Sequence, residues 1–99
     1  MVMQKIKLTK IKELPNAESP NNINEGEYRI GIMETEPSIG LSFVLTFVTE
    51  RNGIKTQSGS YFYTSSVTEI IDKHTFKTIN SIYKIEYLKW DLSINDLFN

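Results

Sequence analysis

The stretch "TSSVTEIIDKHTFKTINSIYKIEYL", Thr64 to Leu88, decides the fold class, because its first part fits either a helix or a strand. Residues 66–69, SVTE, have the order of a helix capping box, and apolar side chains follow them at helical spacing. Against a helix, β-branched residues crowd the same segment, and these favour strands. Residues 72–75 are typical of a turn, in which the Asp72 side chain can bond the backbone beyond it. We therefore expect strand–turn–strand, with the helix as the alternative.

Polar and apolar residues alternate elsewhere along the chain, which is the pattern of a half-buried strand. Strands are expected within residues 5–9, 28–33, 43–48, 54–56, 61–63, 67–72 and 76–87. In the first of them the alternation slips, and a bulge near Thr9–Lys10 would return Ile11 to the inner face. Asn52-Gly53 predicts a two-residue type I′ hairpin turn, because both positions tolerate positive φ. Residues 16–26, NAESPNNINEG, are expected to form a loop.

Five to seven short strands with tight turns and little helix indicate an all-β protein. The expected architecture is a small antiparallel barrel or a two-layer sandwich, formed by 99 residues as one domain. Segment 43–48 is apolar on both faces, which marks it as the central strand, and the expected burial of both faces favours the barrel. Residues 90–99 are expected to form a short C-terminal helical turn. Their apolar side chains should cover the core or meet a partner chain, so a homo-oligomer is expected.

Composition excludes several classes of function. The chain has no cysteine, which excludes disulfides, thiolate catalysis and cysteine zinc sites, and favours an intracellular, cytoplasmic setting. A net charge of -1 argues against strong nucleic-acid binding. No apolar run is long enough to span a membrane, so no membrane association is expected.

Side chains suited to catalysis or metal binding are few. The single histidine, His74, lies in the expected turn, and no motif pairs it with a nucleophile or a second metal ligand. The close acidic pairs Glu25/Glu27 and Glu34/Glu36 lack the spacing of an EF-hand loop and are expected to face solvent. No glycine-rich phosphate-binding motif is present. We therefore expect no catalytic residue, no metal site and no cofactor.

Hydroxyl, amide and tyrosine side chains gather in the stretch quoted above and just before it. If segments 67–72 and 76–83 pair about the turn, residues 78–81 return close to residues 64–68. Such groups can hold a small polar ligand, because rings stack on a base or sugar and short side chains bond its edges. The predicted ligand-binding residues are Tyr61, Tyr63, Thr64, Ser65, Ser66, Thr78, Asn80, Ser81 and Tyr83. The alternative is a set of cross-strand contacts and turn-stabilising bonds without a ligand.

Three segments also carry a resemblance. They are PSIGLSF (37–43), TSSVTEI (64–70) and FKTINSIY (76–83). The chain resembles small β proteins of Bacteroidetes-type bacteria and their phages that share the pattern P-x-x-G-x-S-F, T-S-x-V-T-E-I and F-x-T-x-N-S-x-Y. The resemblance covers about half of the chain and implies an accessory or phage-encoded binding protein, by analogy of source and size. It brings no active site to transfer.

Together these observations predict a non-catalytic binding protein, encoded by a phage or mobile element, that sequesters a small polar ligand such as a signalling nucleotide. The alternative is a protein-interaction or inhibitor module that binds its protein partner through a strand edge or the C-terminal segment. A small enzyme is the least favoured of the three hypotheses.

Overall fold

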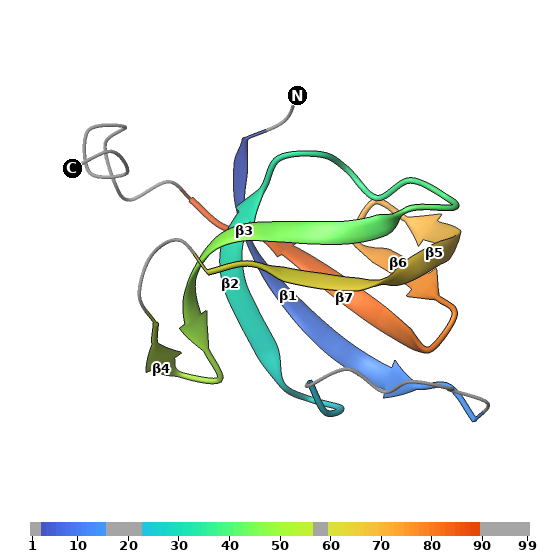
Figure 1. The fold of residues 1–99 in the computed structure, drawn as a ribbon, viewed down its shortest axis with the longest axis horizontal. Coiled ribbons are helices and arrows are strands. Elements are labelled where there is room, and N and C mark those ends of the chain that lie inside the picture. The colour runs from blue at the N-terminus through green and yellow to red at the C-terminus, as the bar shows by residue number, and fades with distance from the viewer. Residues whose placement is uncertain (1–2, 16–22, 57–59, 90–99) are drawn as a thin grey trace.

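The computed structural model describes residues 3–15, 23–56 and 60–89, and within them the chain forms seven antiparallel strands (Figure 1). The strands are β1 (Gln4–Glu13), β2 (Tyr28–Met33), β3 (Ser42–Arg51), β4 (Ile54–Lys55), β5 (Phe62–Asp72), β6 (Thr75–Thr78) and β7 (Ser81–Tyr87). Their order is β2-β1-β7-β6-β5-β3-β4, and β2 also pairs with β3. This last pairing closes six strands into a barrel, with β4 attached to β3. The predicted all-β class is confirmed, and the barrel is the correct alternative.

The stretch that decided the fold class is strand, turn and strand, as expected. The turn after β5 is fastened by the backbone N–H of His74, which donates to Asp72 Oδ1 at 2.8 Å. The single strand expected over residues 76–87 is wrong, however, because the chain turns again between β6 and β7. Thr78 Oγ1 causes this turn by accepting the backbone N–H groups of Asn80 and Ser81 at 3.2 and 3.0 Å.

A bulge interrupts β1, one residue later than expected. The register against β7 shifts between Lys10 and Lys12, so Ile11 is the extra residue. The expectation that Ile11 returns to the inner face is wrong, because Ile11 is 46% exposed whereas Lys10 is 1% exposed. Lys10 can face inward because its ammonium group finds an anionic partner and a carbonyl partner there.

Strand β3 is central, as expected, because it pairs with β2, β4 and β5. Its two faces are not both buried, which corrects the second part of that expectation. Phe43, Leu45 and Val48 face the core, whereas Val44 and Phe47 are exposed. Phe47 has a φ of 46°, in the left-handed region, and the inner positions on either side of it are three residues apart instead of two.

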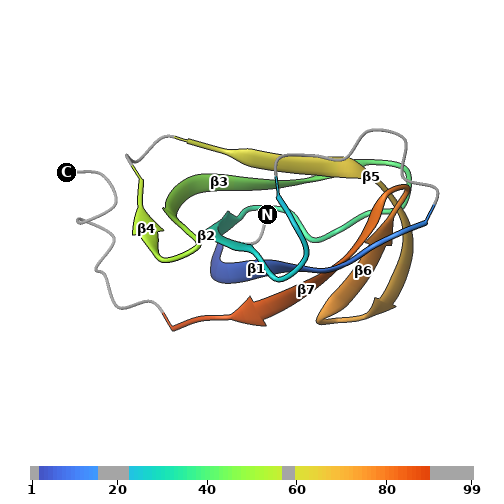
Figure 2. The ribbon, with the colours of Figure 1, turned by 90° about the horizontal axis from the view of Figure 1, so that it is seen from below.

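The core lies inside the barrel, between β3 and β5 on one side and β1, β6 and β7 on the other (Figure 2). Phe76 lies at its centre, with ring centroids 5.0 Å from Phe43 and 5.4 Å from Tyr83. Ile23, from the segment that precedes β2, is buried in the same cluster. This segment therefore covers one end of the barrel with an apolar side chain.

Two turns follow the sequence closely. Asn52 and Gly53 have φ values of 51° and 86°, as the expected type I′ hairpin turn requires. Gly40 has a φ of 92°, and its N–H donates to the carbonyl of Val67 at 2.8 Å, which fastens the β2–β3 connection to β5. The expected C-terminal helical turn and residues 16–22 of the expected loop lie outside the described residues.

Gly31 marks the closest approach between β2 and β3. A Cβ atom there would lie 2.6 Å from the carbonyl oxygen of Thr46 and 2.9 Å from Cγ of Leu45. Gly31→Ala is expected to lower the free energy of unfolding by about 1–3 kcal/mol, because the barrel would have to open locally to admit the methyl group. Urea denaturation measures this, with Ile54→Ala at an exposed site as the control. Equal stability of Gly31→Ala and the native protein would contradict the close approach.

Candidate functional site

The residues predicted to bind a ligand lie in three different environments. Tyr61 and Tyr63 are on the outer surface, and their rings stack on each other with centroids 5.9 Å apart. Tyr83 is fully buried in the core, so its predicted contact with a ligand from solvent needs correction. Its ring points inward because β7 alternates from Ser81, and Tyr83 and Ile85 both take core positions.

The remaining predicted residues form a polar cluster between β5 and the β6–β7 turn, which consists of Thr64, Ser65, Ser66, Thr78, Asn80 and Ser81. The expected return of residues 78–81 to residues 64–68 is confirmed, since Thr78 pairs with Val67 in register. Asn80 Nδ2 donates to Ser65 Oγ at 2.6 Å, and the N–H of Ile79 donates to the Ser66 carbonyl at 3.1 Å. These polar groups bond one another across the strands, which is the arrangement of the alternative without a ligand.

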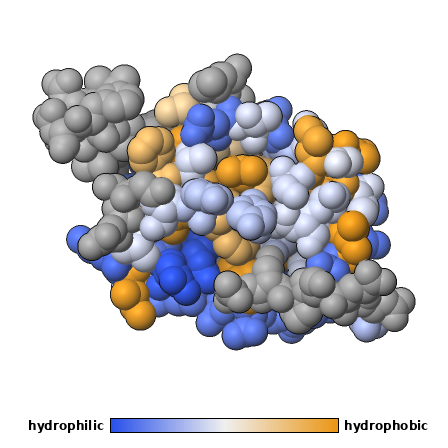
Figure 3. Space-filling model, viewed as in Figure 1, coloured by the Kyte–Doolittle hydropathy of each residue, from blue (hydrophilic) through white to orange (hydrophobic). Residues whose placement is uncertain are grey.

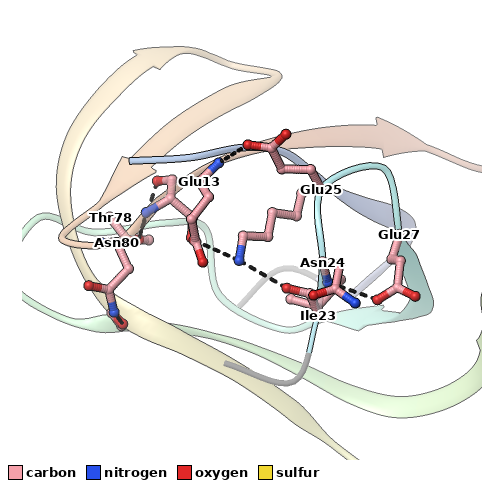
Figure 4. Close-up of polar contacts among 10 residues, drawn as sticks. Glu13, Ile23, Asn24, Glu25, Glu27, Thr78 and Asn80 are labelled. Atoms are coloured by element: carbon pink, nitrogen blue, oxygen red, sulfur yellow. Dashed lines mark hydrogen bonds and ion pairs between the residues drawn. The ribbon is translucent and has the colours of Figure 1, made fainter. Parts of the chain in front are cut away.

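A buried lysine, which the sequence analysis did not single out, organises the barrel end next to this cluster. Lys10 Nζ donates to the Ile23 carbonyl at 2.9 Å and pairs with Glu13 Oε2 at 2.7 Å. Ser81 Oγ donates to the same Glu13 oxygen at 2.9 Å. Figure 4 shows Glu13 and Ile23 converging from different segments, with Glu25 bonded to the backbone N–H of Glu13. The contacts fasten residues 23–27 across the barrel end.

A cleft of about 300 Å³ opens where β2 begins, β3 ends and β5 begins. Its lining combines two arginines with aromatic, aliphatic and hydroxyl side chains, and consists of Arg29, Val48, Arg51, Thr56, Ser60, Tyr61 and Phe62. Figure 3 shows that strongly hydrophilic surface gathers on the lower left of the molecule, the side where β4 lies in Figure 1. Unlike the polar cluster, this cleft is lined by two positively charged side chains, Arg29 and Arg51.

Arg29 and Arg51 are directly opposite each other in the β2–β3 register, so the two guanidinium groups lie on the same face of the sheet. Arg29 is 3% exposed, and its guanidinium carbon lies 5.6 Å from the centroid of the Phe62 ring. Burial, and then the charge of Arg51, lower the pKa of Arg29, while Glu27 and Tyr83 oppose this shift. Among the described residues, no ion pair joins Arg51 to a carboxylate.

The sequence analysis did not identify the Arg29–Arg51 pair, although both arginines lie in or next to expected strands. Arg29 occupies an expected strand and Arg51 precedes the Asn-Gly turn, but 21 residues separate them. Only the register of β2 against β3, the pairing that closes the barrel, places the two arginines opposite each other. Like charges directly opposite each other on neighbouring strands are destabilising, so the pair calls for a reason beyond folding.

The histidine and the acidic pairs considered in the sequence analysis are the remaining candidate functional groups. His74 is exposed, with Nδ1 3.3 Å from the Ile85 carbonyl and its ring edge-on to Tyr87. Glu34 accepts a hydrogen bond from Thr46 Oγ1 at 2.7 Å, in a groove of about 320 Å³ that Glu36 also lines. Within residues 3–15, 23–56 and 60–89, no three His, Cys, Asp or Glu side chains gather as a metal site would require.

Comparison with known proteins gave no relative, since no family model, no curated protein and no solved structure matched the chain. In the part of the chain that the structure describes, no helix is long and apolar enough to cross a membrane.

The Lys10–Glu13 pair leads to a prediction about pH. The hydrogen bond from Lys10 has the largest effect on Glu13 and, together with that from Ser81, lowers its pKa from 4.5 despite partial burial. A lowered carboxyl pKa stabilises the folded state above pH 4.5, and this contribution is lost as the pH falls through the folded-state pKa. Glu13→Gln is expected to cost roughly 1–3 kcal/mol at pH 7, because a buried ammonium loses its ion pair.

Urea denaturation at pH 7 and pH 3 measures both effects. The native protein should lose more stability between these values than Glu13→Gln does. Glu69→Gln, at an exposed position on β5, is the control and should keep the native pH dependence. The same loss in Glu13→Gln and in the native protein would show that the pair does not contribute.

Proposed function

We propose that the protein is a non-catalytic binding protein that takes a small anionic ligand in the Arg29–Arg51 cleft. The observation that carries this proposal is the cross-strand pairing of two arginines, one of them buried, on the wall of a cleft. The proposal keeps the small polar ligand expected from the sequence and moves its binding site. Of the residues expected to bind it, Tyr61 lines this cleft.

An anion fits this cleft because it would remove the cost of the two facing charges. A guanidinium group presents a planar fork of N–H donors that matches phosphate or carboxylate oxygens. Thr56 Oγ1 already donates to the Val48 carbonyl, at 2.5 Å, so the recognition of charge is assigned to the arginines. Glu27 acts on Arg29 but does not line the cleft.

The size of the cleft bounds the ligand. About 300 Å³ is at the lower end of the range for small-molecule sites, which favours a small ligand over a polymer. The net charge of -1 gives no long-range attraction for a polyanion. An intracellular setting and a phage or mobile-element source stay predictions of the sequence.

Thermal denaturation with inorganic phosphate and pyrophosphate tests the proposal. A ligand that binds the folded state raises Tm, and the rise grows with ligand concentration. The native protein should show this rise, and Arg51→Ala should lose it, since Arg51 is exposed and its removal leaves the core intact. Lys55→Ala removes a cation that does not line the cleft and should behave as native. No rise in the native protein, or the same rise in Arg51→Ala, would contradict the proposal.

A second candidate function is contact with a second copy of this chain through the outer wall of β3 and β5. Val44 and Tyr63 are opposite each other in register and both are exposed, as is Leu41, which lines the same groove as Val44. Clustered exposed apolar side chains of this kind mark interaction sites. Closure of the barrel leaves only the two-residue strand β4 with an unpaired edge among the described strands, which favours the wall over the expected strand edge.

Analytical ultracentrifugation tests this second candidate. We expect the native protein to sediment as a dimer and Val44→Lys as a monomer, because the added charge would be buried in the interface. Ile54→Lys, at an exposed position on β4, should leave the dimer unchanged. A monomeric native protein would remove the candidate.

A further inference from the structure

Tyr61 borders the Arg29–Arg51 cleft and extends it onto the outer surface of β5. It is 66% exposed, and Tyr63, two residues along the same face, is 59% exposed. The two rings stack with their planes 24° apart. The wall beside the two arginines is therefore a pair of aromatic rings that is open to solvent.

The fold itself does not require these two rings. The inner positions of this part of β5 belong to Phe62, which packs against the core cluster, and to the buried Thr64. Within the described residues, neither Tyr61 nor Tyr63 donates its hydroxyl to another group. Buried tyrosines usually find such a partner, and stacked rings left exposed offer a π-face to a planar ligand.

We infer, on the basis of the proposed function, that the ligand is a nucleoside monophosphate. The phosphate binds Arg29 and Arg51, and the base stacks on Tyr61. One molecule then uses both features that folding leaves unexplained, the facing guanidinium groups and the exposed ring beside them. Stacking is tolerant of base identity because every base has a π-face, so the site is expected to bind purine and pyrimidine monophosphates.

Isothermal titration calorimetry with four probes tests this inference. The probes are inorganic phosphate, ribose 5-phosphate, adenosine and adenosine monophosphate. The monophosphate should bind at least about fivefold more tightly than ribose 5-phosphate, because stacking adds to the phosphate contacts. Tyr61→Ala should abolish this ratio and leave the affinity for ribose 5-phosphate unchanged. Arg51→Ala should weaken the binding of both.

Tyr87→Ala is the matched control, since Tyr87 is an exposed tyrosine on β7 that does not line the cleft. Equal affinity for adenosine monophosphate and ribose 5-phosphate, with both lost in Arg51→Ala, would overturn the base contact and leave the proposed function standing. A ratio that persists in Tyr61→Ala would also overturn the base contact. No binding of any phosphate probe, or adenosine binding as tightly as its monophosphate, would overturn the inference and the proposed function together.

Discussion

The pairing of β2 with β3 is the constraint on which the rest of the structure depends. It closes the barrel. It also requires a residue without a side chain at position 31, because the backbone of Gly31 lies against Thr46 and Leu45. The register shifts between Ile30 and Ile32, so that residues 47–49 of β3, Phe47 among them, have no partner residue on β2. Beyond the shift the strands meet again with two arginines face to face. Closure of the barrel and creation of the candidate site are therefore the same structural event.

Two charged pairs near the end of the barrel, Lys10 with Glu13 and Arg29 with Arg51, differ in the sign of their charges. On one side, the ammonium group of Lys10 meets Glu13 and the carbonyl of Ile23, so that a buried charge is compensated by the chain itself. On the other side, Arg29 and Arg51 face each other across the strands, and none of the described residues that line the cleft is a carboxylate. The repulsion between the two facing guanidinium groups is what points to an external anion at the second side.

Much of this fold follows from local signals, whereas the candidate site does not. Alternation with a period of two residues and the Asn52-Gly53 turn act through neighbouring residues, so strands and hairpins can be predicted from them. The turn after β6 was missed because it depends on a hydrogen bond of the Thr78 side chain, which competes with continued strand. The facing of Arg29 and Arg51 depends on barrel closure and on a register shift, and no local pattern encodes either.

The polar stretch between β5 and β7 shows why a concentration of polar side chains need not mark a binding site. Hydroxyl and amide groups gather there because each turn and each strand crossing needs local donors and acceptors. Asn80 and Ser65 satisfy each other, and Thr78 satisfies the turn that follows it. A ligand would have to break these bonds before making its own, whereas an anion in the arginine cleft would reduce the repulsion between Arg29 and Arg51. In this fold, two facing like charges are therefore a stronger argument for a ligand than an accumulation of polar groups that bond one another.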